Sequence, residues 1–107
     1  MENAKQWTFL TNHAMVLNCI ARSPSITAWE ISMAVGIQER STRRIIADLV
    51  EAGYVTTEKE GRRNRYVIRE HLPLRHPSGS ATEVGDLLDI LNPKRGKRSS
   101  PREKQAS

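Results

Sequence analysis

The stretch AWEISMAVGIQERSTRRIIADLVEAGYVTTEKEGRRNRYVI, residues 28 to 68, decides the fold of this chain. It begins with a short apolar segment that ends at Gly36, and a longer segment follows from Gln38 to Ala52. Residues 53 to 68 then alternate apolar and polar side chains on both sides of a turn that contains Gly61. A glycine often ends a helix, and alternation around a glycine turn is typical of a β-hairpin. The stretch therefore predicts two helices followed by a hairpin.

The longer predicted helix, residues 38–52, has two distinct sides. At about 100° per residue its apolar side chains form one narrow stripe, and a second side carries arginines. The stripe consists of Thr42, Ile45, Ile46 and Leu49, whereas Arg40, Arg44 and Ala47 lie opposite, with Ser41 and Arg43 on the flanks. Gln38 is a poor N-cap, so we expect the start of this helix to fray or shift by a residue. The shorter helix before it is predicted to begin at a capping box, Thr27 to Glu30.

The flanking sequence adds two more amphipathic helices. The segment from Thr11 to Arg22 has a broad apolar face and stops at Ser23-Pro24, and Thr11 or Asn12 can cap its start. Residues 71–82 are rich in Pro, Ser and Gly and are predicted to be an irregular linker. A helix from Glu83 to Leu91, capped by Thr82, follows. The expected organisation is a domain at 1–70, the linker at 71–82, the short helix at 83–91 and a disordered basic tail at 92–107.

Net charge says little about the folded part, because the excess is confined to the tail. Residues 1–91 hold 11 basic and 11 acidic side chains, whereas residues 92–107 hold six basic side chains and one acid, so that 6 − 1 gives the whole +5. A single cysteine excludes an intramolecular disulfide framework. The chain shows neither a signal-peptide pattern nor an apolar run of the roughly 18 residues that a membrane helix needs. We therefore expect a soluble cytoplasmic protein that does not associate with membranes.

The order of these elements resembles the winged helix-turn-helix domain, and residues 9–68 carry the resemblance. The stretch quoted above is similar to the DNA-binding core of MarR-like and ArsR-like transcription regulators. The similarity lies in the apolar helix before V-G-I at the turn, in the longer helix that ends L-x-E-A-G-Y, and in a hairpin with a basic tip. The resemblance implies a mainly α (α+β) fold, namely a three-helix bundle with a two-stranded β-hairpin wing, here extended by a short C-terminal helix.

The resemblance also implies double-stranded DNA as the partner and transcription regulation as the function. In the family the helix after the turn lies in the major groove, and the wing contacts the backbone or the minor groove. The positions that match the groove-facing side of that helix hold Gln38, Arg40, Ser41, Arg43 and Arg44. The positions that match the wing hold Lys59, Arg62 and Arg63. Arginine pairs with guanine and glutamine with adenine, so the residue types suit base contacts. Glu39, Glu58 and Glu60 lie in the same regions, and their negative charges would repel DNA phosphates.

Simpler interpretations stand beside each of these assignments. Arginines on an exposed helix are most often solvated, and Arg44 has the i, i+4 spacing for an ion pair with Asp48. The aromatic residues Trp7, Phe9 and Trp29 are expected in the core, and Tyr54 and Tyr66 on the packing face of the hairpin. Four residues that bind transition metals elsewhere, His13, Cys19, His71 and His76, match no compact ligand pattern. No catalytic motif is present in the sequence. We expect no enzyme activity, no cofactor and no metal.

Two further questions stay open at the level of sequence. The helix at 83–91 either folds back on its own domain, which is the commoner fate of a short apolar stripe, or pairs with a second subunit to form a homodimer. A winged-helix domain also serves in some proteins as an adaptor that binds another protein, and the arginine side then meets acidic residues. A third alternative is non-specific nucleic-acid binding through the tail alone.

Overall fold

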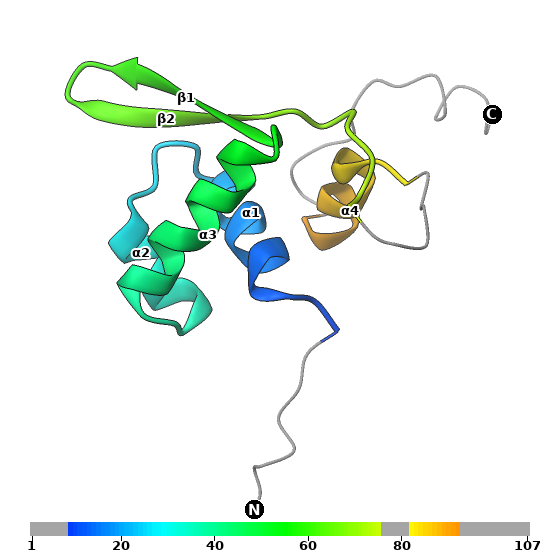
Figure 1. The fold of residues 1–107 in the computed structure, drawn as a ribbon, viewed down its shortest axis with the longest axis horizontal. Helices are drawn as coiled ribbons and strands as arrows, with labels where there is room; N and C mark the ends of the chain where they lie inside the picture. Colours follow the sequence, from blue (N-terminus) through cyan, green and yellow to red (C-terminus); the bar gives the residue numbers. More distant parts are fainter. Residues whose placement is uncertain (1–8, 76–81, 93–107) are drawn as a thin grey trace, which may run out of the picture.

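The computed structural model describes residues 9–75 and 82–92, which form four helices and one two-stranded antiparallel sheet (Figure 1). The element order is α1 (Asn12–Arg22), α2 (Ala28–Val35), α3 (Glu39–Glu51), β1 (Val55–Glu60), β2 (Arg63–Ile68) and α4 (Val84–Leu91). The described ranges are thus an α+β structure. The helices α1 to α3 pack together, the hairpin extends over them to one side, and α4 lies on the other side (Figure 1). Within these ranges no helix is both long and apolar enough to span a membrane.

The caps fix the boundaries of α1 and α2. Thr11 Oγ1 accepts a hydrogen bond from the Ala14 N–H at 3.2 Å, which starts α1 at the next residue. The predicted capping box is confirmed, because Thr27 Oγ1 accepts from the Glu30 N–H at 3.1 Å while Glu30 Oε1 accepts from the Thr27 N–H at 3.0 Å. Gly36 ends α2 with a φ of 86°, a left-handed conformation that a residue without Cβ adopts at little cost.

The helix α3 spans Glu39–Glu51, one residue shorter at each end than the sequence predicts. Gln38 is its N-cap residue and makes no side-chain capping hydrogen bond, as expected from its poor capping propensity. The predicted apolar stripe is confirmed: Thr42, Ile45 and Leu49 are buried, and Ile46 packs against the core. Thr42 Oγ1 donates to the Gln38 carbonyl oxygen at 3.1 Å, which satisfies a hydroxyl group that has no access to water.

The hairpin pairs Val55 with Ile68 at its base and Glu60 with Arg63 at its tip. Gly61 and Arg62 therefore form a two-residue turn, and Gly61 has a φ of 66° whereas that of Arg62 is negative. A glycine at the first central position is typical of the type II′ turn, whose twist matches that of the strands. The Tyr66 N–H donates to the Pro24 carbonyl oxygen at 2.9 Å. This bond joins β2 to the segment between α1 and α2, so the helices set the direction of the hairpin.

The last helix folds back onto its own domain. Val84 and Leu88 are buried in the same cluster as Val16, Leu17 and Ile20 of α1. At the end of the helix the Asn92 side-chain amide donates to Asn18 Oδ1. The prediction that Thr82 caps α4 is wrong, because Glu83 is the N-cap residue and its N–H donates to Asp86 Oδ2 at 3.2 Å. The Asp86 carboxylate thus satisfies the backbone N–H of the N-cap residue, as the N3 side chain of a capping box does.

The described ends of the predicted linker are hydrogen-bonded to each other. The Val84 N–H donates to the Leu72 carbonyl oxygen at 2.9 Å, and the Leu74 N–H donates to the Thr82 carbonyl oxygen at 2.8 Å. Between them Pro73 and Glu83 form an isolated antiparallel bridge. The Tyr54 hydroxyl donates to the Pro73 carbonyl oxygen at 2.7 Å. These bonds hold α4 against the hairpin base. Residues 76–81 and the predicted tail from residue 93 onward lie outside the described residues.

Two aromatic residues that the sequence assigned to the core are exposed. Trp29 is 57% exposed and Phe9 is 91% exposed, so both predictions are wrong. The reason is visible in α2, where Ala28, Ile31 and Ser32 form the buried side. The segment AWEISMAV is apolar on nearly all sides, so hydrophobic periodicity could not tell which side faces the core. Trp7, assigned to the core with them, lies outside the described residues. Tyr54 and Tyr66 pack against the core, as predicted.

Candidate nucleic-acid interface

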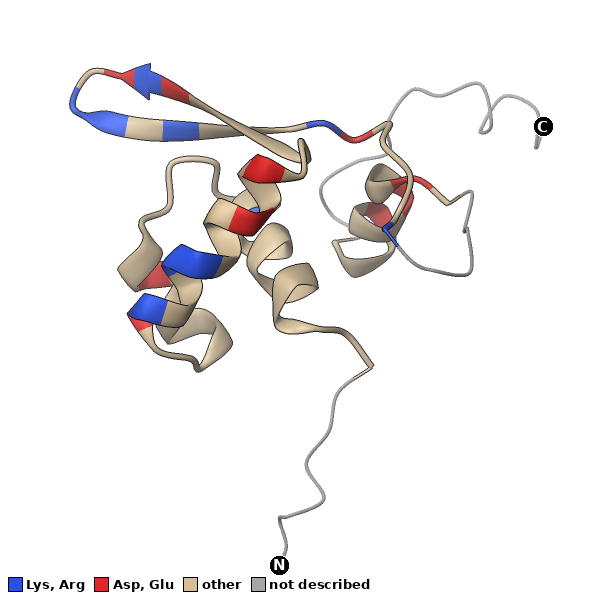
Figure 2. Ribbon diagram, viewed as in Figure 1, with Lys and Arg blue, Asp and Glu red and all other residues tan. Residues whose placement is uncertain are grey.

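Basic side chains gather on the first half of α3. Its acidic side chains, apart from Glu39 in the first turn, lie on the second half. The predicted residues Gln38, Arg40, Ser41, Arg43 and Arg44 are all exposed. Further along the same helix Asp48 and Glu51 are exposed as well. Figure 2 shows this change of charge along α3, together with a second group of basic residues around the tip of the hairpin. The exposed side of α3 therefore favours an anion at its N-terminal half and disfavours one at its C-terminal half.

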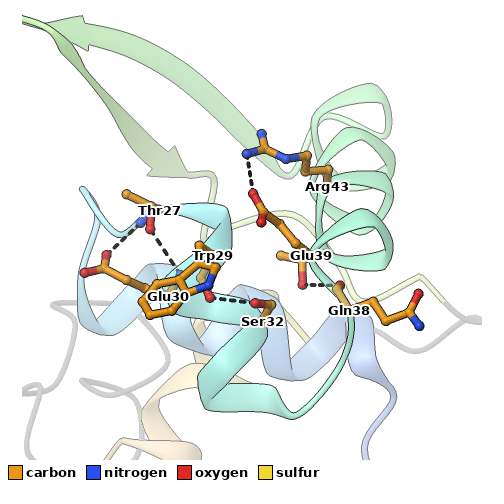
Figure 3. A network of polar contacts seen from close by, with 8 residues as sticks. Thr27, Trp29, Glu30, Ser32, Gln38, Glu39 and Arg43 are labelled. Atoms are coloured by element: carbon orange, nitrogen blue, oxygen red, sulfur yellow. Dashed lines mark hydrogen bonds and ion pairs between the residues drawn. The ribbon is translucent and has the colours of Figure 1, made fainter.

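The two i, i+4 ion pairs that α3 can form turn out differently. Arg43 Nη2 lies 2.6 Å from Glu39 Oε2, and the two side chains are 67% and 40% exposed (Figure 3). The pair that Arg44 and Asp48 could form by their spacing is not among the ion pairs of the described residues. Asp48 Oδ2 instead lies 2.8 Å from His13 Nε2 of α1. Surface pairs of this kind contribute roughly 0.3–0.5 kcal/mol. Arg43 can therefore exchange Glu39 for a phosphate at little cost, and Arg44 is available to a ligand.

The register of the hairpin distributes its charges unequally. Glu60 lies opposite Arg63 and Glu58 lies opposite Arg65, so these four side chains share one face. Lys59 lies opposite Asn64, and Arg62 occupies the turn, so neither has an acid directly across the hairpin. Of the three predicted hairpin residues, Lys59 and Arg62 thus contribute the less compensated charge. The sequence suggested that Glu58 and Glu60 would reduce the positive charge of the whole hairpin. In the structure they act mainly on the face that carries Arg63.

A groove joins α3 to the hairpin. It has a volume of about 360 Å³ and lies between the hairpin, the start of α2 and the side of α3. The residues that line it are Ser25, Ile26, Thr27, Ala28, Arg43, Ile46, Arg62, Arg63, Asn64 and Tyr66. Three of the predicted residues, Arg43, Arg62 and Arg63, are brought together there. The other five, Gln38, Arg40, Ser41, Arg44 and Lys59, are exposed outside this groove.

The start of α2 contributes polar groups to this groove that the sequence interpretation missed. Thr27 lines it, and the carboxylate of Glu30 in the same turn lies near enough to Arg63 to sense its charge. The pKa of Glu30 is lowered, first by the hydrogen bond from the Thr27 backbone N–H and also by the Thr27 side chain and Arg63. The sequence offers no local pattern from which this contact could be predicted. Residues 25–28 lie beside residues 62–64 because the nearby hydrogen bond between Tyr66 and Pro24 joins the two segments.

A second and larger hollow of about 700 Å³ lies between α1, the end of α3 and α4. Leu17, Leu49 and Leu87 are among its apolar lining residues, and His13 and Asp48 lie at its polar edge. Cys19 is partly buried, and burial raises the pKa of its thiol, which disfavours the reactive thiolate.

The metal-ligand candidates are not assembled into one site. Among the described ranges no group of three or more His, Cys, Asp or Glu side chains could hold a metal ion. His13 lies beside Asp48, whereas His71 Nδ1 lies 3.3 Å from Glu83 Oε1. His76 lies outside the described residues.

Comparison with known proteins adds no family to this geometry. No protein-family model matches the chain, and no curated protein sequence matches it either.

Proposed function

We propose that this protein is a transcription regulator that binds double-stranded DNA in a sequence-specific manner through a winged helix-turn-helix domain. In this proposal α2, the turn at Gly36 and α3 are the helix-turn-helix, and the hairpin β1–β2 is the wing. The four helices and the antiparallel hairpin are compatible with that layout. α3 enters the major groove and the hairpin lies along the backbone beside it.

The observation that carries the proposal is the groove shared by Arg43, Arg62 and Arg63. Side chains from α3 and from the hairpin tip come together although a strand separates them in sequence. Arginines that converge from two elements suit a polyanion that touches both elements at once, as a DNA backbone does. Arginines that served only to keep the surface solvated would not need to come together from two elements.

The charge change along α3 supports a particular orientation on DNA. Asp48 and Glu51 repel phosphates, so the N-terminal half of α3 goes deepest into the groove. Arg40 and Arg44 on that half contact base edges, with Gln38 and Ser41 beside them. Arg43 lies on the flank that faces the hairpin and contacts phosphate or the groove edge. Lys59, Arg62 and Arg63 neutralise phosphates.

The first test selects from random duplex DNA with a chain that ends at Asn92. This end point removes the six basic tail residues and retains the hydrogen bond from Asn92 to Asn18. We expect a defined motif to be enriched, and log affinity to fall against log salt with a slope of about 0.9 per neutralised phosphate. The proposal would be refuted if removal of the tail abolished DNA binding and the full chain enriched no motif either. The arginine side of α3 would then be assigned to a protein partner.

A second test separates base contacts from phosphate contacts. Arg40→Ala and Arg44→Ala should change the preferred bases, because one bidentate pair discriminates by about 1–3 kcal/mol. Arg62→Ala should weaken binding to all DNA sequences alike and reduce the slope of log affinity against log salt by about 0.9. Arg69→Ala is the matched control, since this exposed arginine lies just beyond the base of the hairpin. Equal loss on every sequence for Arg40→Ala and Arg62→Ala would contradict the assigned roles.

A further inference from the structure

We propose that Trp29 is a DNA-contacting residue, with its indole N–H donating to a backbone phosphate next to the one held by the hairpin. This inference rests on the proposed function and adds to it a residue of α2. The starting observation is the exposure of Trp29, whose bulky side chain at the start of α2 is 57% exposed. An exposed tryptophan combines a large apolar surface with one polar donor, which suits a contact with sugar and phosphate.

The position of Trp29 is fixed by the first turn of α2. The two residues before it, Thr27 and Ala28, line the groove that holds Arg43, Arg62 and Arg63. The residue after it, Glu30, lies close enough to Arg63 for the two charges to interact. Trp29 therefore projects from the turn that borders the basic groove. Figure 3 shows the indole on the outer surface of α2, in the view where Arg43 extends toward the hairpin.

Two of the backbone N–H groups of that turn are engaged within the capping box. The Glu30 N–H donates to Thr27 Oγ1, and the Thr27 N–H donates to Glu30 Oε1. The Trp29 carbonyl oxygen accepts from Ser32 Oγ at 2.6 Å. The Trp29 indole N–H has no acceptor among the hydrogen bonds of the described residues. A polyanion seated in the basic groove supplies one.

A second exposed apolar residue on α2 supplies the matched control. Met33 is 66% exposed and, like Trp29, is not among the residues that line the basic groove. It lies one turn further along α2 from Thr27 and Ala28, which do line it. A surface that docked another protein through α2 would use both residues, because they are neighbours at i, i+4 on the same helix. A contact with DNA beside the groove uses Trp29 and not Met33.

The test uses the full chain with Trp7, the other tryptophan, replaced by phenylalanine so that Trp29 alone emits. Binding is measured by the anisotropy of a labelled duplex that carries the selected motif, and Trp29 is followed by its emission and by acrylamide quenching. We expect the duplex to lower the quenching constant at least about twofold. In the same background Trp29→Phe should weaken binding about fivefold and Trp29→Ala about tenfold, whereas Met33→Ala should change it less than about twofold.

The salt dependence distinguishes this contact from a structural role. Trp29→Phe removes a neutral donor, so affinity should fall on all sequences while the salt slope stays unchanged. Circular dichroism and thermal melting of each variant check that α2 remains folded. If DNA binds but leaves the quenching of Trp29 unchanged, this inference is wrong and the proposed function stands. If no duplex binds at all, the proposed function itself fails. Equal losses from Trp29→Ala and Met33→Ala would instead assign α2 to a protein partner and overturn the inference.

Discussion

Replacing Leu88 with alanine is expected to destabilise the protein strongly, because α4 contributes to the core of the domain that it follows. Leu88 has no exposed surface and lies in one cluster with residues of α1, α2, α3 and β1. Truncation of a buried leucine to alanine costs about 2–5 kcal/mol, which combines lost transfer free energy with the cavity that remains. We expect about 3 kcal/mol here, since the short helix can relax partly toward the space.

The measurement is urea unfolding followed by the helical circular dichroism signal. For a small domain the free energy falls by roughly 1–3 kcal/mol per molar urea, so a loss of about 3 kcal/mol moves the midpoint by about 1–3 M. Ile90→Ala is the control, because it removes a similar side chain from the same helix at a position that is 73% exposed. It should change stability by less than about 0.5 kcal/mol. Similar small effects of both substitutions would refute the packing of α4 on α1.

Two further substitutions test the helix starts. Thr27→Ala should lower the free energy of unfolding by about 1 kcal/mol through loss of the cap, as measured by the same urea titration. Because the folded pKa of Glu30 lies below its ordinary value of 4.5, its contribution is complete above that pH and is lost as the pH falls through the folded value. Glu30→Gln should therefore reduce the loss of stability between about pH 6 and about pH 3. If the free energy of unfolding fell equally over this pH range in both proteins, the role of Glu30 in the capping box would be contradicted. Gln38→Ser supplies the missing cap of α3 and should raise stability by about 0.5–1 kcal/mol, whereas no gain in thermal midpoint would mean that the helix start is already satisfied.

Local patterns in the sequence were sufficient for most of the elements. The capping box at Thr27, the end of α2 at Gly36 and the hairpin turn at Gly61 each depend on residues within one turn of each other. The stripe from Thr42 to Leu49 predicted the buried side of α3, because its two sides differ sharply in polarity. The helix α2 has no such contrast, and the prediction for Trp29 failed there. The bridge between residues 72–74 and 82–84 was also missed, since Pro, Ser and Gly gave the segment the composition of a loop.

The candidate interface divides in the same way. The sequence by itself determined which residues are charged or polar. All eight predicted residues are exposed because charged and polar side chains on the polar side of a helix or hairpin are rarely buried in a small core. Only the tertiary structure decided that Arg43, Arg62 and Arg63 share a groove with the start of α2, that Asp48 turns to His13, and that α4 packs on α1. Helix and strand periodicity depends on near neighbours along the chain. These contacts instead join residues far apart in sequence, and the hairpin direction and the packing of the core bring them together.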